Sequence, residues 1–286
     1  MKRIRDLMLD ELRLRNAAPA TQEAYLRCAA NFAVAIGVPP LRATKETIRA
    51  FLASLTAREV HVSTLKMFIA AIRFLYIHVL NRPGLVEWIP WPKTPKRLPE
   101  ILSPEEVDQL LQHAPTHLAQ VTISLAYGTG LRLAEVCHLQ AKDVVSDRGV
   151  IHVHEGKGSR DRLVPLTPSV LAELRSWWLF RRPPGPWIFP AVRRDGDCIG
   201  DRTVQNGFRL AVARAGIQKA VTFHSLRHAY ATHQLENGVD IISLQALLGH
   251  ATLSTTMIYL HVRADRLARL SSPLDALPSK KAAANP

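Results

Sequence analysis

One segment restricts the folds open to this chain more than any other: NRPGLVEWIPWPKTPKRLPE, residues 81–100, which contains five prolines. Proline has no backbone N–H and its ring clashes with the preceding helical turn, so no helix can run through this segment. A length of 286 residues leaves room for two domains. We therefore expect one domain over residues 1–96, including the proline-rich linker 81–96, a second over 97–275, and a disordered tail over 276–286.

Both domains are predicted to be mainly helical. Apolar residues recur at spacings of three and four in YLRCAANFAVAIG, TIRAFLASL and STLKMFIAAIRFLYIHVL, which favours about four helices in the first domain. In the second, Ser103 can cap a helix that continues with Pro104 and with Glu106 at the position of a capping box. Strict alternation appears in GVIHVH and RDRLVPL, on either side of the turn EGKGS, and predicts a β-hairpin. The expected fold class is mainly α (α+β), with four N-terminal helices and a mostly helical second domain that contains a small β-hairpin or sheet.

The positive charge of the chain is concentrated in its first third. Lys and Arg number 37 against 24 Asp and Glu, a net charge of +13, and residues 1–98 hold 16 basic and only 7 acidic residues. Concentrated positive charge favours a polyanionic partner, most often nucleic acid, although a basic surface that keeps a protein soluble is the alternative. The candidate DNA contacts, on two predicted helices of the first domain, are Lys45, Arg49, Lys66 and Arg73.

Other compositional features argue against export and against a metal framework. The N-terminal MKRIRDLMLDELRLR mixes acids and bases and has no apolar core, unlike a signal peptide, and the apolar runs are judged too short to cross a bilayer. The three cysteines are far apart, which predicts neither a disulfide framework nor a metal site and fits a reducing cytosol.

The second domain offers the groups that covalent cleavage of a phosphodiester needs. That chemistry requires a nucleophile, cations for the non-bridging oxygens, and an acid for the leaving oxygen. The candidates, in chain order, are Arg132, Lys157, His224, Arg227, His250 and Tyr259. Each alone has a simpler interpretation as a surface charge, a helix cap or a core aromatic, so only their order and spacing carry weight.

The histidines also invite an interpretation as a metal site. His224 and His228 are four residues apart, one turn of a helix, and His233 follows five residues later. No cysteine or acidic pattern completes a ligand set, so we expect no metal here. His228 and His233 are instead interpreted as packing or hydrogen-bonding residues.

Four strings in this domain resemble the signature boxes of the tyrosine recombinase (phage integrase) family: TGLRLAE, HEGKGSRDRLVPL, HSLRHAYATHQLENG and LLGHATLSTTMIYLHV. They occur in the family's order and span about residues 131–262. The first domain resembles the family's SAM-like core-binding domain only in size, helicity and charge. Only 23 positions separate Arg227 from His250, which leaves no room for the added segment of integron integrases and favours a Xer-like or transposon-associated member.

The resemblance implies a mechanism that uses a covalent 3′-phosphotyrosyl intermediate and neither a metal nor ATP. Tyr259 would be the nucleophile, and Arg132 and Arg227 would clamp the non-bridging oxygens. Lys157 would protonate the leaving 5′-oxygen. The remaining implied roles are general base or proton relay for His224, a hydrogen bond to the phosphate for His250, and orientation of active-site groups for Glu135.

The same resemblance implies the partners. They are double-stranded DNA with an inverted-repeat recombination site and further copies of the chain, as a homo-tetramer on DNA, with a free monomer left open. Leu267, Leu270 and Leu274 would dock on a neighbour, or on their own subunit. We expect a nucleoid-associated protein of the bacterial cytoplasm that acts in integration, excision or resolution of a mobile element or replicon. Type IB topoisomerase-like relaxation and a catalytically silent DNA-binding relative are the alternatives.

Overall fold

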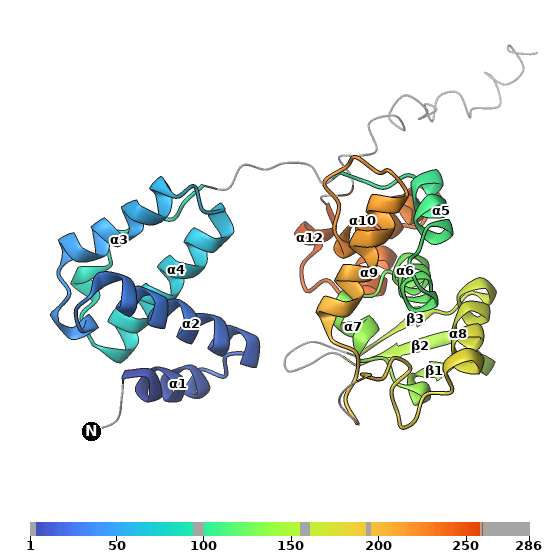
Figure 1. Ribbon diagram of the computed structural model, residues 1–286, viewed down its shortest axis with the longest axis horizontal. Helices are drawn as coiled ribbons and strands as arrows, with labels where there is room; N and C mark the ends of the chain where they lie inside the picture. Colours follow the sequence, from blue (N-terminus) through green and yellow to red (C-terminus); the bar gives the residue numbers. More distant parts are fainter. Residues whose placement is uncertain (1–3, 94–99, 155–160, 193–195, 258, 260–286) are drawn as a thin grey trace, which may run out of the picture. The chain divides into compact units, whose positions relative to one another are not determined.

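The computed structural model describes residues 4–93, 100–154, 161–192, 196–257 and 259. The chain divides into two compact units, residues 1–97 and 98–286, each of which is described here by itself. Helices dominate both, and the only sheet among the described residues is a small three-stranded one, which confirms the mainly α fold class (Figure 1). Lys157, the three leucines expected at a subunit contact and the tail 276–286 lie outside the described residues.

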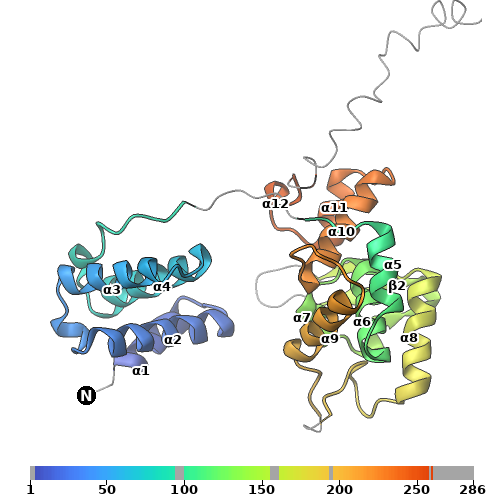
Figure 2. The same cartoon turned by 45° about the horizontal axis from the view of Figure 1, so that its top comes forward.

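Unit 1 is a bundle of helices around one apolar core (Figure 2). Its main helices are α1 (Ile4–Leu14), α2 (Pro19–Ile36), α3 (Lys45–Ala57) and α4 (Val62–Phe74), and α4 continues into a wider π-helical turn, Leu75–Val79. The stripes of apolar residues that predicted these helices supply the core, where Phe32, Ile48 and Ile72 are fully buried. Gly37 ends α2 in the left-handed region, with φ of 66°.

The first half of the proline-rich segment is part of unit 1. Val86 and Ile89 are buried in the helical core, on either side of an exposed Glu87. The guanidinium of Arg73 on α4 donates to the carbonyls of both residues, at 3.1 and 3.4 Å. The segment over residues 81–89 is therefore anchored by packing and hydrogen bonds, which its proline content did not predict.

The expectation that no apolar run could span a bilayer needs correction for one helix. Val62–Val79 is long and apolar enough to do so by length and composition. In the structure this helix packs against α2, and its Ile69, Ile72 and Leu75 are buried in the core of unit 1. Its apolar character is explained by that packing.

Unit 2 is built around α6, which packs against five other helices, α5, α7, α8, α9 and α10 (Figure 1). Its helices are α5 (Pro104–Gln112), α6 (His117–Thr129), α7 (Leu133–Cys137), α8 (Pro168–Arg181), α9 (Asp201–Arg214), α10 (Phe223–Glu236), α11 (Ile241–Leu248) and α12 (Leu253–Met257). The capping box predicted at Ser103 is present, because its hydroxyl accepts from Glu106 N and the Glu106 carboxylate accepts from Ser103 N.

The sheet of unit 2 has the antiparallel order β1-β2-β3. Its strands are β1 (Val144–Val145), β2 (Val150–Val153) and β3 (Arg162–Pro165). Strands β2 and β3 form the predicted hairpin, in which Ile151 pairs with Val164 and Val153 with Arg162. Alternation places Ile151, Val153 and Val164 in the core. Arg162 lies on this inner face too, which brings a cation into the interior of unit 2.

Candidate active site

Three arginines from three different elements meet at the C-terminal end of α11. The last carbonyls of a helix have no partner within the helix and carry its partial negative charge, so cations are stabilised there. Here three consecutive carbonyls each accept from a different guanidinium. The contacts are Arg162 Nε to Leu247 O at 2.9 Å, Arg227 Nη2 to Leu248 O, and Arg132 Nη2 to Gly249 O at 2.8 Å. Residues separated by up to 117 positions in the sequence thus converge on one turn.

Glycines make this convergence possible. Gly249 ends α11 with φ of 63°, and Gly130 ends α6 with φ of 69°, both in the left-handed region that favours glycine. A Cβ at Gly130 would lie 2.5 Å from the ring of Tyr230, so no larger residue fits without a shift. The carbonyl of Gly130 accepts from Arg227 Nη1 at 2.8 Å, and Arg132 follows two residues later as the N-cap of α7.

Glu135 fixes two of the three arginines. Its Oε1 accepts from Arg132 Nη1 at 2.7 Å and from Arg162 Nη1 at 3.0 Å, and its Oε2 accepts from Arg132 N at 2.7 Å and from Arg162 Nη2 at 2.8 Å. Burial alone would raise the pKa of this carboxyl, but the hydrogen bonds and charge of Arg162, and then those of Arg132, outweigh it and hold the pKa at about 2. Glu135 is therefore ionised at neutral pH and holds both guanidinium groups in place.

Arg227 is the most deeply buried of these cations, with an exposed fraction of 1%. Burial, followed by the charge of Arg132, lowers its pKa to about 10, which still leaves it protonated at neutral pH. Two of its nitrogens donate to backbone carbonyls, while its Nε has no hydrogen-bond partner among the described residues. An unused buried donor is costly in a folded protein, and an anionic oxygen would satisfy it.

Tyr259 lies beside this group in a covered position. Its exposed fraction is 2%, and its ring packs against a small apolar cluster that includes Tyr230 and Leu248. Its hydroxyl shares a 2.8 Å hydrogen bond with Nδ1 of His228, so the phenol oxygen faces a polar group. Burial raises the pKa of Tyr259, and the nearby charge of Arg227 opposes that rise. The phenol is therefore protonated in this conformation.

The three histidines of this region have different environments. His224 and His228 lie one turn apart on α10, with ring centroids 4.6 Å from each other. His224 is exposed. Burial, and then the neighbouring His224 and Arg227, lower the pKa of His228 to about 4. His250 follows the glycine that ends α11 and bonds Thr256 through Nδ1 at 2.8 Å, and burial, then Arg227, lower its pKa to about 4. His228 and His250 are thus neutral at pH 7.

Comparison with known proteins then places the chain. The sequence profile of the Phage integrase family matches residues 100–266, and that of the Phage integrase N-terminal SAM-like domain matches residues 4–84. The chain belongs to the phage integrase family. It is a tyrosine recombinase, an enzyme that transfers DNA strands in site-specific recombination.

Individual relatives agree with this assignment. The recombinase is 36% identical over 284 residues to the putative integrase/recombinase y4qK of Sinorhizobium fredii, covering 97% of this chain and 90% of the relative. It is 37% identical over 221 residues to the tyrosine recombinase XerA of Pyrococcus furiosus, covering 76% of each. Its fold is similar to that of the XerH site-specific recombinase bound to its difH substrate, with a TM-score of 0.69 at 23% identity, covering 89% of this chain and 79% of that one.

Of the six candidate residues of the recombinase, five lie in the described part of the chain. Arg132, Arg227 and His250 meet at the end of α11, and His224 and Tyr259 both adjoin His228. The sixth, Lys157, lies outside the described residues. His233 is hydrogen-bonded through Nδ1 to the hydroxyl of Tyr127 at 2.9 Å, which fits its interpretation as a structural residue.

Two participants were missed by sequence reasoning. Arg162 was not a candidate, yet the alternation of RLVPL puts it on the same face of β3 as the buried Val164, and a buried arginine needs a partner. His228 was interpreted as a packing or hydrogen-bonding residue without a named partner, and its bond to Tyr259 depends on how the chain beyond α11 folds back onto α10. The first signal was present in the sequence, whereas the second was not.

The DNA-contact candidates of unit 1 differ in how they are held. Lys45 and Arg49 are exposed and lie over the ring of Trp88, at 5.6 and 4.7 Å from its centroid. Lys66 is half-buried. Arg73 is half-buried as well and holds the two backbone carbonyls already described, so it contributes to the structure of unit 1. A contact of any of the four with DNA stays a prediction.

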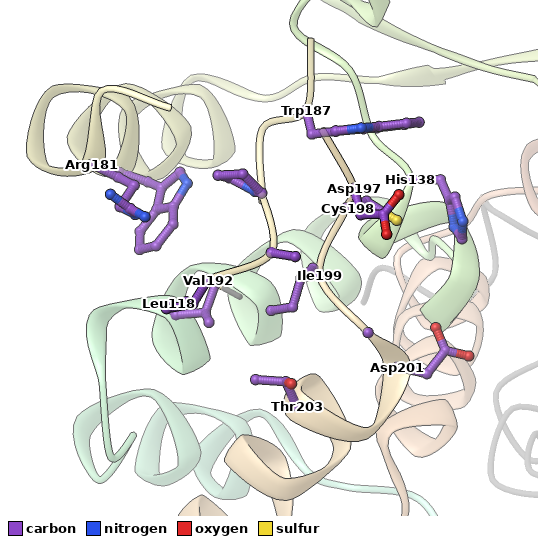
Figure 3. Close-up of a pocket in the computed structure, with 14 residues that line it drawn as sticks. Leu118, His138, Arg181, Trp187, Val192, Asp197, Cys198, Ile199, Asp201 and Thr203 are labelled. Carbon is purple, nitrogen blue, oxygen red and sulfur yellow. The ribbon is translucent and has the colours of Figure 1, made fainter. Parts of the chain in front are cut away.

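A large pocket of the recombinase lies away from the arginine cluster. It is formed between α8 and the loop that leads into α9, and Trp187, Asp197, Cys198 and Asp201 are among the residues that line it (Figure 3). None of the predicted catalytic residues lines it. The converging charges of the candidate active site therefore do not coincide with this pocket.

Proposed function

We propose that Tyr259 is the nucleophile with which this recombinase cuts and rejoins DNA at a specific site. One observation carries the proposal: Arg132 and Arg227 converge on the turn at residues 248–249, while the hydroxyl of Tyr259 is bonded to the helix that carries Arg227. Cleavage of a phosphodiester through a covalent intermediate uses this combination of paired guanidinium groups and an adjacent oxygen nucleophile.

The proposed cleavage step conserves the phosphodiester. The phenol of Tyr259 loses its proton, its oxygen bonds to phosphorus, and the bond from phosphorus to the 5′-oxygen breaks. The leaving 5′-oxygen takes a proton, which we assign to Lys157. Arg132 and Arg227 neutralise the charge that develops on the non-bridging oxygens. Rejoining is the reverse attack by a different 5′-hydroxyl, so the step needs neither a metal nor ATP.

Tyr259 has to leave its covered position before it can attack. With 2% of its surface exposed and its hydroxyl bonded to His228, it is out of reach of a phosphate on DNA. In this position Tyr259 keeps its proton, because its own pKa is raised and His228, with a pKa of about 4, is a weak base. We propose that DNA binding frees the phenol and brings it next to the arginines, where its pKa falls.

The remaining roles follow from position. His224 is exposed at the first turn of α10, one turn from Arg227, and we assign to it the general base or relay that receives the phenol proton. His250 is neutral, adjoins the arginine turn, and is assigned a hydrogen bond to a non-bridging oxygen. Glu135 positions Arg132 and has no contact with the reacting atoms.

The proposed setting is a homo-tetramer on double-stranded DNA with an inverted-repeat site, in the bacterial cytoplasm. The net charge of +13 and its concentration in residues 1–98 support DNA as the partner. The proposed biological role is integration, excision or resolution of a mobile element or replicon.

The experiment uses two duplexes that carry the DNA flanking the gene. Recombination predicts molecules with exchanged ends, which sequencing of the new junctions detects. Relaxation of a supercoiled plasmid without new junctions would support topoisomerase-like activity. The absence of both products would support a silent DNA-binding relative. Arg227→Lys should abolish the junctions, whereas Arg175→Lys, at an exposed position on α8, should not.

A further inference from the structure

A second cluster of chemically active side chains lies on the outer face of the hairpin formed by β2 and β3. His152 and His154 are two residues apart and therefore project from the same face of this strand. The register pairs Val153 with Arg162, and one more step places His154 across from Asp161. The potential ligand atoms of His152, His154 and Asp161 all lie within 4.8 Å of one another.

We infer that the outer face of this hairpin binds a divalent transition-metal ion of the zinc class through His152, His154 and Asp161. Two imidazoles and a carboxylate form a ligand set of the kind that holds Zn²⁺, with the fourth position left to water. The site does not rest on the proposed function and uses none of the residues assigned to DNA cleavage.

The distances fit a tetrahedral ion. Oδ2 of Asp161 lies 3.1 Å from Nδ1 of His154 and 3.5 Å from Nε2 of His152. Ligand bonds of about 2.0–2.1 Å at tetrahedral angles place neighbouring donor atoms about 3.3 Å apart. The two separations from Asp161 bracket this value, and the ligand atoms of the two histidines lie within 4.8 Å of each other, so side-chain rotation can complete the set.

A buried carboxylate orients the central ligand. Asp143, with 7% of its side chain exposed, accepts from Gln140 N at 3.0 Å through Oδ2, and its Oδ1 lies 3.1 Å from Nε2 of His154. With an ion bound, Asp143 can accept a hydrogen bond from Nε2–H of His154, which leaves Nδ1, the nitrogen that faces Asp161, as the ligand atom. A carboxylate behind a metal-binding histidine is the usual partner that fixes its tautomer and ring orientation.

A pocket lined by His152, His154 and Asp143 extends to Glu135, the carboxylate that holds two of the active-site arginines. His154 and Asp161 also border residues 155–160, which contain Lys157. A bound ion would therefore fix the separation of the two chain positions between which the proposed catalytic lysine lies.

The test is metal binding by the full chain, prepared without a histidine tag. Titration with Co²⁺ should show one ion per chain with the strong visible absorption of a four- or five-coordinate site, and Zn²⁺ should displace it. His154→Gln and Asp161→Asn should each abolish this absorption. His113→Gln, which removes an exposed histidine at the end of α5, should leave it intact.

Two further variants distinguish this site from metal binding elsewhere on the chain. Asp143→Asn should weaken binding about 10–100-fold without removing any ligand, because an amide can donate to Nε2 and shift the hydrogen to Nδ1. His228→Gln should bind Co²⁺ unchanged, since the active-site histidines are not ligands. Slower amide exchange at Val153 and Arg162 on loading would show that the ion ties the strands together.

Three results would overturn the inference. One is the absence of a one-to-one complex. Another is binding that persists when His152 and His154 are both replaced by glutamine. The third is binding that His228→Gln removes, which would place the ion among the active-site histidines. None of these measurements depends on recombination activity.

Discussion

Replacement of Glu135 by glutamine tests the electrostatic frame of the active site. The carboxylate accepts four hydrogen bonds, three of them from guanidinium nitrogens, and an amide can accept at only one of its two positions. Glu135→Gln therefore leaves Arg132 and the buried Arg162 facing an N–H₂ group. Removing one partner of a buried ion pair costs about 3–5 kcal/mol.

The depressed pKa gives an independent magnitude. A shift from 4.5 to about 2 corresponds to roughly 3 kcal/mol of folding free energy at pH 7, at about 1.4 kcal/mol per unit. Because the pKa of the folded state is lowered, this contribution is present above pH 4.5 and is lost as pH falls toward 2. The stability difference between the native chain and Glu135→Gln should be about 3 kcal/mol at pH 7, about 2.5 at pH 4 and about 1.5 at pH 3.

The assay is urea denaturation of the full chain at each pH, with amide exchange in β3 identifying the transition of unit 2. Glu173→Gln on α8 is the control and should change stability by less than about 0.5 kcal/mol. The reasoning is refuted if Glu135→Gln is within about 0.5 kcal/mol of the native chain at pH 7. It is also refuted if the difference keeps its size down to pH 3.

Three further changes have defined outcomes. Gly130→Ala should lower the free energy of unfolding, measured by urea denaturation, by about 2–4 kcal/mol, because φ is positive and a Cβ there meets the ring of Tyr230 at 2.5 Å. Gly216→Ala, where φ is 67° and no atom lies near the added Cβ, should lower it by about 1–2 kcal/mol. Arg227→Lys should lower the strand-cleavage rate at least about 100-fold with DNA affinity nearly unchanged in a gel-shift assay, and equal losses of both would contradict its role. The pKa of His228 falls from 6.5 to about 4 on folding, so protonation of this residue favours the unfolded chain. At pH 5 it should lower the free energy of unfolding of unit 2 by about 2 kcal/mol. His228→Gln should reduce this loss of stability in acid, and His113→Gln should not.

The local structure was predictable from local chemistry. Ser103 with Glu106 marks the start of α5, and the alternation on either side of EGKGS marks the hairpin, because capping and side-chain period act over a few residues. The order of the motif residues also pointed to the site. Each of these signals is contained within a short stretch of sequence.

The arrangement at the end of α11 was not predictable in the same way. Which carbonyl each arginine caps depends on how α6, α10, α11 and β3 pack, and these elements are separated by tens of residues. The bond between Tyr259 and His228 has the same origin. The burial of Val86 and Ile89 in the core of unit 1 was also missed, because the prolines around them excluded an α-helix over residues 81–93 but said nothing about burial.

The central claim is tested most directly by identifying the residue that becomes attached to DNA. A nicked suicide substrate with the flanking DNA should trap a covalent complex, and peptide mapping should find the phosphodiester on Tyr259. Tyr259→Phe should give no complex, while Tyr230→Phe, which alters the neighbouring buried tyrosine, should still give one. A trapped complex from Tyr259→Phe, or a modified residue at any other position, would contradict the account.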